Sequence, residues 1–274
     1  MHVTIGNGRS YIKQYGIMTD YTDEKMPFTI HLEELKTRLV RAMIAIGVCF
    51  VACYCVKETL FKLLTLPLVA VLPDNSSMIF TSLPEAFFTY LKVSFFASIF
   101  LASPYVLYQL WKFISPGLYK SERKYVVPFV TFSTIFFLGG SLFAYYVVFP
   151  FGFKFFIGFG NEVIRPMLSL REYLSFSMKL LIAFGVIFEL PIFMFFLAKI
   201  GMVNSRVLAK KRKYAILLVF VIAALLTPPD VVTQVLMALP LMLLYEISIW
   251  VVKMGEKKSS TGEKDNKEAR KNDK

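Results

Sequence analysis

Two carboxylates stand beside basic residues where apolar stretches of the chain begin or end. Glu34 lies in the segment HLEEL ahead of the first apolar run, and Glu122 lies in the polar turn after the second. A carboxylate can accept a forked, charge-assisted pair of hydrogen bonds from a guanidinium group, so each of these two acids could bind a guanidinium. The alternative is an ordinary salt bridge, from Glu34 to Arg38 and from Glu122 to Arg123 or Lys124.

A third carboxylate, Glu189, lies inside an apolar run, in the segment FGVIFELP. An ionised acid near the middle of a bilayer costs about 2.5 to 3.5 kcal/mol, so we expect Glu189 to be protonated, paired within a helix bundle or facing water. Pro191 cannot donate a backbone hydrogen bond and should bend the helix beside the acid. A purely structural hydrogen bond is the alternative role.

The segment LLTPPDVVTQ places hydrogen-bonding side chains between the last two apolar runs. Pro228 and Pro229 should end one helix, and Asp230 is well placed to cap the next. Thr227 and Gln234 could offer hydrogen bonds to a partner helix that carries a matching polar residue.

These side chains are embedded in a chain with the composition of a membrane protein. Hydrophobic residues make up 56% of it, 28 residues are Phe and 18% are charged, which would leave a soluble fold unable to cover its apolar surface. The net charge of +12 could suggest nucleic acid, but the bases cluster in loops between apolar runs. Anionic lipid headgroups explain the charge better, so membrane lipid and no nucleic acid is the expected partner.

Apolar runs near the roughly 20 residues of a spanning helix predict an all-α, polytopic membrane protein with six spans. The predicted spans are residues 39–56, 86–114, 125–153, 173–200, 214–226 and 231–252, of which 214–226 is short. Lys and Arg alternate between many and few in successive loops, which predicts that both termini are cytoplasmic. The long loops 57–85 and 154–172 should fold over the outer face as a cap.

The two ends of the chain differ from its middle. Residues 1–26 form a polar extension in which Met18 and Met26 offer alternative starts, so the first Met need not be the native one. Residues 27–253 are the predicted membrane domain. Residues 254–274 have almost no apolar side chains and are predicted to be a disordered cytoplasmic tail.

Enzyme chemistry is poorly supported by this sequence. His2 and His31 are its histidines, and metalloprotease, nucleophile-elbow and phosphate-loop motifs are missing. Cys49, Cys53 and Cys55 lie in the first span without histidine nearby, and we interpret them as small apolar residues. We therefore expect neither a catalytic residue, nor a metal, nor a cofactor.

Four spaced segments, taken together, resemble those of one protein family. They are HLEEL followed by Arg38, the pattern P-x3-YQ-x-W-x-F-x2-P-x-LY-x2-ERK over residues 104–124, FGVIFELP and LLTPPD. In this order, over residues 27–253, they resemble TatC, the multispanning core subunit of the twin-arginine protein translocase.

The resemblance implies a six-helix, glove-shaped scaffold in the bacterial cytoplasmic (inner) membrane. It would bind the N-terminal twin-arginine signal peptides of folded proteins and, with TatA and TatB type single-span partners, export these proteins using the proton-motive force. Self-association in a receptor complex is also implied.

The resemblance also implies roles for individual residues. The signal peptide would bind at Glu34, Glu122, Phe113 and Leu118, and Glu189 would be the buried acid of the concave face. Two further groups complete this set, namely a partner-docking edge at Thr227 and Gln234 and an outer cap and turn at Pro67 and Asp230.

Two other classes of function fit parts of the pattern. A proton-coupled small-solute transporter would use Glu189 as its proton carrier, but no inverted repeat of the kind common in transporters is found. A purely structural assembly subunit would make no contact with a substrate.

Overall fold

The computed structural model describes residues 28–72, 78–79, 82–114, 126–160, 167–227 and 230–272. These residues are almost all helical, as the sequence predicts. The elements are α1 (Phe28–Cys55), α2 (Lys57–Val69), β1 (Met78–Ile79), α3 (Glu85–Ile114), α4 (Val126–Phe143), the π-helical turn η3 (Ala144–Val148), α5 (Phe149–Ile157), β2 (Leu168–Ser169), α6 (Leu170–Phe188), α7 (Leu190–Lys199), α8 (Ser205–Lys210), α9 (Arg212–Leu226) and α10 (Val231–Asn272).

Within the described ranges, five helical segments are long and apolar enough to cross a membrane. They are Leu32–Cys55, Glu85–Ile114, Val127–Ile157, Leu170–Lys199 and Val231–Glu256. Each agrees to within a few residues with a predicted span, except that α1 extends the first one toward the N-terminus. The remaining predicted span corresponds to α9, whose 15 residues reach about 22 Å.

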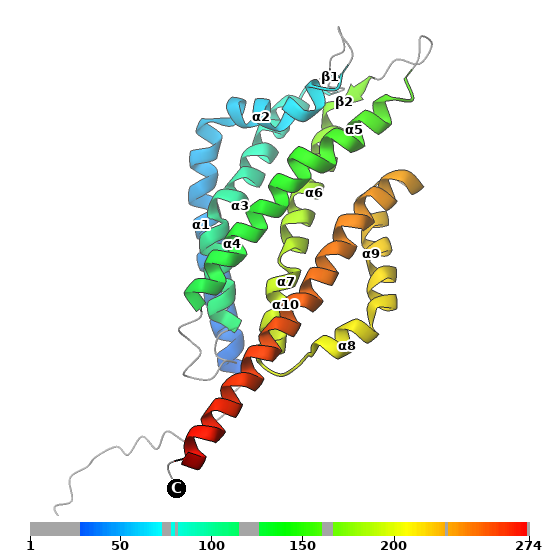
Figure 1. Cartoon of the computed structure of the whole chain (residues 1–274). Coiled ribbons are helices and arrows are strands. Elements are labelled where there is room, and N and C mark those ends of the chain that lie inside the picture. The colour runs from blue at the N-terminus through cyan, green and yellow to red at the C-terminus, as the bar shows by residue number, and fades with distance from the viewer. Residues whose placement is uncertain are drawn as a thin grey trace, which may run out of the picture.

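The helices pack as a series of neighbours that follows the chain. α1 packs against α3, α3 against α4, and α4 against α6, while α10 packs against both α7 and α9. Figure 1 shows α1 at one side of this series and α9 with α10 at the other, and α2 lying across the end of the bundle near β1 and β2. The two strands are a parallel pair in which Met78 is opposite Leu168.

A close approach of α4 and α6 joins the middle of the bundle. A Cβ atom on Gly140 would lie 2.6 Å from the backbone oxygen of Phe184 and 2.6 Å from the ring of Phe188. The Ser141 hydroxyl donates a hydrogen bond of 3.0 Å to the carbonyl of Leu181 in α6. Small residues at such a seam allow two membrane helices to pack backbone to backbone.

The helix that contains FGVIFELP is interrupted at the acid. α6 ends at Phe188, α7 begins at Leu190, and Pro191 stands in the first turn of α7. Proline is favoured in that turn because its missing N–H would have no partner there. The interruption places Glu189 between two helices and agrees with the bend that Pro191 predicts.

The last span and the C-terminal segment are continuous in the structure. The structure continues α10 without a break from the last span to Asn272. Residues 254–272 are rich in Lys, Glu and other strong helix formers, so a helix that has already begun can extend through them. The predicted N-terminal extension, residues 1–26, lies outside the described residues.

Candidate functional site

One end of the bundle is closed by α2, β1 and β2, which we call the cap (Figure 1). Pro67 is buried within α2, so the proline expected in a cap does lie in this element. Two tyrosines from the spans bind the backbone of α2: Tyr145 donates to the carbonyl of Leu63 at 2.5 Å, and Tyr173 donates to that of Leu64 at 2.6 Å. These long-range hydrogen bonds hold the cap on the bundle.

Glu85 makes a third connection at the cap. This carboxylate is only 7% exposed, and it accepts hydrogen bonds from the backbone N–H of Ser82 at 3.3 Å and of Arg171 at 3.1 Å. The first bond is half of a capping box at the start of α3. The second joins α3 to the first turn of α6, 86 residues farther along the chain.

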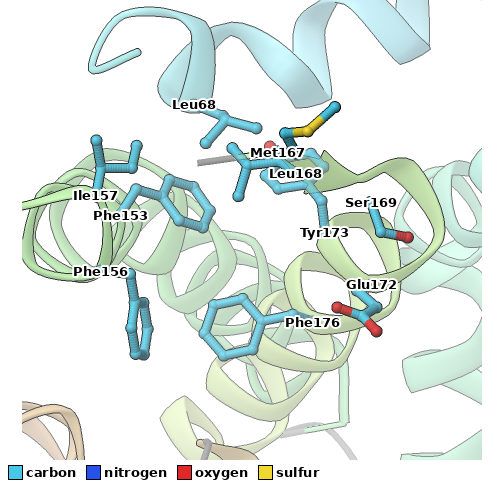
Figure 2. A pocket seen from close by; sticks show the side chains of 10 residues that line it. All are labelled: Leu68, Phe153, Phe156, Ile157, Met167, Leu168, Ser169, Glu172, Tyr173 and Phe176. Carbon is cyan, nitrogen blue, oxygen red and sulfur yellow. The ribbon is translucent and has the colours of Figure 1, made fainter. Parts of the chain in front are cut away.

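A pocket of about 260 Å³ lies beneath the cap, between α5 and α6. Figure 2 shows the rings of Phe153 and Phe156 on one side, Leu68 of α2 above them, and Glu172 with Ser169 at the opposite side. The pocket is therefore an apolar space with its single carboxylate at the rim.

The opposite end of the bundle, which we call the open end, holds the start of α1, the end of α3 and the junction of α7 with α8 (Figure 1). Glu34 lies there in the second turn of α1, and its side chain is 26% exposed. Arg38 donates to Glu34 Oε1 from Nε at 3.2 Å and also from Nη2. The ordinary i,i+4 salt bridge that the spacing allowed is thus present.

The other predicted signal-binding residues lie around the end of α3. Phe113 is half-buried one residue before α3 ends at Ile114. Leu118 and Glu122 lie outside the described residues. The structure therefore places Glu34 and Phe113 on helices that pack together, α1 and α3.

Glu189 contacts a hydrogen-bonded pair that comes from two other helices. The indole Nε1 of Trp111 in α3 donates to the hydroxyl of Ser133 in α4 at 2.7 Å, and Ser133 lies beside the Glu189 carboxylate. Ser133 is fully buried. Glu189 Oε1 is buried and has no hydrogen-bond partner among the described residues. An acid with an unsatisfied oxygen can take a further donor.

A cavity of about 470 Å³ opens beside this acid. Its walls come from α3, α4, α6 and α7, and besides Glu189 and Ser103 they are apolar or aromatic, with Trp111, Leu110 and Phe193 among them. The combination of an apolar cavity with one acid suits an apolar segment that carries a hydrogen-bond donor.

The residues predicted for partner docking form hydrogen bonds within this chain. Thr227 is buried and donates to the carbonyl of Ala223 in its own helix at 2.9 Å. Gln234 Nε2 donates to the carbonyl of Phe220 at 3.1 Å, which joins α10 to α9.

Asp230 caps α10, as predicted. Its carboxylate accepts from the backbone N–H of Thr233 at 2.7 Å and from the Thr233 hydroxyl. This is the interaction of an N-cap aspartate with the third residue of a helix.

Comparison with known proteins places this arrangement in one family. The family model described as "Sec-independent protein translocase protein (TatC)" matches residues 30–240. The chain belongs to the TatC family. The TatC of Desulforapulum autotrophicum is 55% identical over 242 residues, which cover 88% of this chain and 90% of that protein. The TatC of Magnetococcus marinus is 49% identical over 242 residues, covering 88% and 89%.

Solved TatC structures share the fold. A crystal structure of the "Twin Arginine Translocase Receptor- TatC" matches with a TM-score of 0.75 and 40% identity, covering 82% of this chain and 99% of that one. A second, in DDM, has the same TM-score, 41% identity and coverages of 81% and 99%. These findings confirm the TatC resemblance and the predicted protein-translocase function, and they do not favour a small-solute transporter.

Sequence reasoning missed three pairings in this TatC chain. The Trp111–Ser133 hydrogen bond and the bond from Arg171 to Glu85 join helices that are distant in sequence, so spacing could not reveal them. The local half of the Glu85 site had a signal, because Ser82-x-x-Glu85 is the pattern of a capping box.

Arg212 and Glu246 form the third missed pairing. Arg212 Nε and Nη2 donate to the two carboxylate oxygens of Glu246 at 2.7 and 2.8 Å, across α9 and α10. The two residues lie 34 positions apart, so spacing along the chain could not reveal this pair.

Proposed function

We propose that this TatC-family chain is the receptor and core subunit of a twin-arginine translocase. It binds the signal peptides of folded precursor proteins and, with TatA and TatB type single-span partners, exports these precursors by means of the proton-motive force. The observation that carries the proposal is the likeness over 82% of the chain to a solved twin-arginine translocase receptor, together with an acid, Glu34, at the open end of the bundle.

The proposed signal site uses Glu34 and Glu122 as guanidinium acceptors, with Phe113 and Leu118 beside them. In the structure, Arg38 binds Glu34 through a geometry that an incoming arginine could also use. A surface i,i+4 ion pair contributes only about 0.3 to 0.5 kcal/mol, so its exchange for a signal arginine costs little. Lysine is a point charge without the forked donors of arginine, which gives arginine selectivity.

The proposed path of the signal's apolar part passes the cavity beside Glu189. That cavity is lined almost entirely by apolar side chains, and the unsatisfied Oε1 of Glu189 can accept one hydrogen bond from a segment that enters. In this proposal, Glu189 is the intramembrane acid that senses the bound segment or a partner helix.

The proposed topology has six spans, with α9 as the short fifth span and both termini in the cytoplasm of a bacterial inner membrane. The open end then faces the cytoplasm and the cap faces outward, in a glove-shaped bundle. Support comes from the bases Lys199, Lys210 and Lys211, which lie at the open end near the α8 segment. Self-association in a receptor complex completes this proposal.

Partner docking is proposed at the α9–α10 edge. Gln234 supports it by joining α10 to α9 through its hydrogen bond to Phe220, and Thr227 ends α9 with a hydrogen bond to Ala223. The surface offered to a single-span partner would be the exposed apolar face of α9, which includes Leu217, Val221 and Leu225.

The experiment is export of a prefolded twin-arginine reporter in a strain that lacks TatC. Glu122→Ala should abolish export, and Glu34→Ala should have the same effect in a milder form. The amount of membrane-inserted protein should stay normal in both. Arg38→Ala is the matched control for Glu34, because it breaks the same salt bridge but leaves the acceptor in place. Normal export by the Glu34→Ala/Glu122→Ala double variant would disprove the recognition site.

A second measurement addresses Glu189. We expect Glu189→Ala to reduce transport and crosslinking to partner helices, because the buried acceptor is lost. Glu172→Ala, which removes an exposed acid at the cap, is the control. Transport and crosslinking that stay at the parent level in Glu189→Ala would remove this residue from the mechanism.

A further inference from the structure

A second apolar groove lies on the bundle where three membrane-spanning segments meet. Its volume is about 390 Å³, and its walls include Phe129 and Phe132 of α4, Phe195 and Lys199 of α7, and Val251 of α10. It shares no lining residue with the cavity beside Glu189. The groove is therefore separate from the proposed signal site.

The groove is shaped by tight packing of α10 on α7. A Cβ atom on Gly255 would lie 2.7 Å from the ring of Phe195, so the glycine lets α10 approach the aromatic wall. Phe129 closes the other side and is only 8% exposed, whereas Phe132 at the mouth is 57% exposed. The groove therefore has aromatic walls and opens toward the surroundings of the bundle.

The lining is apolar along the groove and basic at one end. Lys199 is the one charged residue among its lining residues, and it closes the last turn of α7. Lys253 follows Val251 on α10 by two residues and is also exposed. All three helices belong to apolar segments long enough to cross a membrane, so the groove runs alongside hydrocarbon and ends at bases near the headgroup level.

We propose that this groove is a binding site for one anionic phospholipid. An acyl chain lies between Phe129, Phe132 and Phe195, and the headgroup phosphate lies beside Lys199. This lipid and the groove are complementary along their whole length, because an apolar chain fits the aromatic walls and an anionic head fits the basic end. A transmembrane peptide whose side chains are all apolar would offer no anionic group to Lys199. The proposal does not depend on the signal-binding function.

The protein contains a suitable reporter. Of its two tryptophans, Trp111 is 5% exposed and stacks on Phe129 with ring centroids 4.9 Å apart, so it lies directly behind the groove wall. Trp250 is 65% exposed on α10. The Trp250→Phe variant therefore leaves one tryptophan, which lies between this groove and the cavity beside Glu189, so the Lys199 variants decide from which side it is quenched.

The experiment compares quenching of Trp111 in the full-length Trp250→Phe protein by lipids with brominated acyl chains. The protein is placed in nanodiscs of phosphatidylcholine that contain small, equal fractions of either brominated phosphatidylglycerol or brominated phosphatidylcholine. We expect the anionic lipid to be preferred by about five-fold, the effect of one base near the membrane surface. The preference should vanish in Lys199→Gln and in Lys199→Glu.

Two controls separate the groove from general effects. Lys213→Gln removes an exposed base from α9 at the same end and should keep the preference. The Trp111→Phe variant, which reports from Trp250 instead, should be quenched equally by both lipids.

The proposal is overturned by equal quenching of Trp111 by the two lipids. It is also overturned by a preference that survives in both Lys199 variants, because the anionic lipid would then lie elsewhere. Absence of any quenching would mean that the groove is filled by polypeptide or inaccessible, which equally overturns it. None of these outcomes bears on export of a prefolded twin-arginine protein, so the receptor function is tested separately.

Discussion

The polar side chains of the cap and those of the open end have different kinds of hydrogen-bond partner. At the cap, Glu85, Tyr145 and Tyr173 each form a hydrogen bond to the backbone of another segment. At the open end, Glu34 is paired within its own helix, and deeper in the bundle, between α6 and α7, Glu189 keeps one buried oxygen without a partner among the described residues.

The two kinds of hydrogen bond differ in how readily a bond to a ligand can replace them. A backbone N–H or carbonyl that loses a buried partner has no replacement, so the bonds of the cap are hard to open. A short-range ion pair or an unsatisfied carboxylate oxygen can accept an incoming donor at little cost. The cap is thus a fixed scaffold, and the open end is where a ligand can compete.

The α4–α6 seam gives the largest expected effect. Gly140→Ala should lower the free energy of unfolding by about 3 kcal/mol, because the new methyl group meets a backbone oxygen that cannot move aside. Thermal unfolding in mild detergent measures this. A Cβ on Gly139 meets nothing within 4 Å, so Gly139→Ala should be neutral or stabilising. Equal effects of the two substitutions would mean that the seam is not tightly packed.

Glu85→Ala should have the next largest effect. It removes the acceptor for Ser82 and Arg171, and bonds to charged groups contribute about 1.5 to 3 kcal/mol each, so we expect a loss of about 2 kcal/mol. The melting temperature and the protease sensitivity of residues near β1 would report it. Glu172→Ala, at an exposed acid of the same end, should change stability by less than about 0.5 kcal/mol. If both behave alike, the cap is not held by Glu85.

The smallest effect is expected for Arg212→Ala at the open end. The ion pair with Glu246 has good two-point geometry, but its side chains are 50% and 52% exposed. Exposed pairs contribute about 0.2 to 1 kcal/mol and are screened by salt. The loss should therefore be small and should fall further at high salt. A loss as large as that of Glu85→Ala would contradict the contrast between the two ends.

Several elements were predictable because their causes are local. The spans follow from runs of apolar residues, and five of them appear with limits close to the predicted ones. The capping of α10 by Asp230 and the interruption of the helix at Pro191 depend on neighbours within a few residues. The disordered tail was predicted from composition alone, whereas the structure continues α10 into it.

The candidate site was predictable only in part. The Glu34–Arg38 pair was foreseen as an alternative because four residues separate its members on one helix. Thr227 and Gln234 stay predictions for partner docking, and the hydrogen bond from Gln234 to Phe220 depends on the packing of α10 on α9. Spacing along the chain could not decide this, since it depends on which helix faces lie together.

The amino-acid sequence by itself determined that the chain is a membrane-spanning helical protein, where its acids stand along each span, and which family it resembles. These properties depend on hydrophobicity, short-range spacing and spaced motifs. Only the tertiary structure decided that the hydrogen-bonded pair of Trp111 and Ser133 lies beside Glu189, and that Glu85 reaches the first turn of α6. Such contacts depend on how distant helices pack, and many packings are compatible with the same apolar pattern.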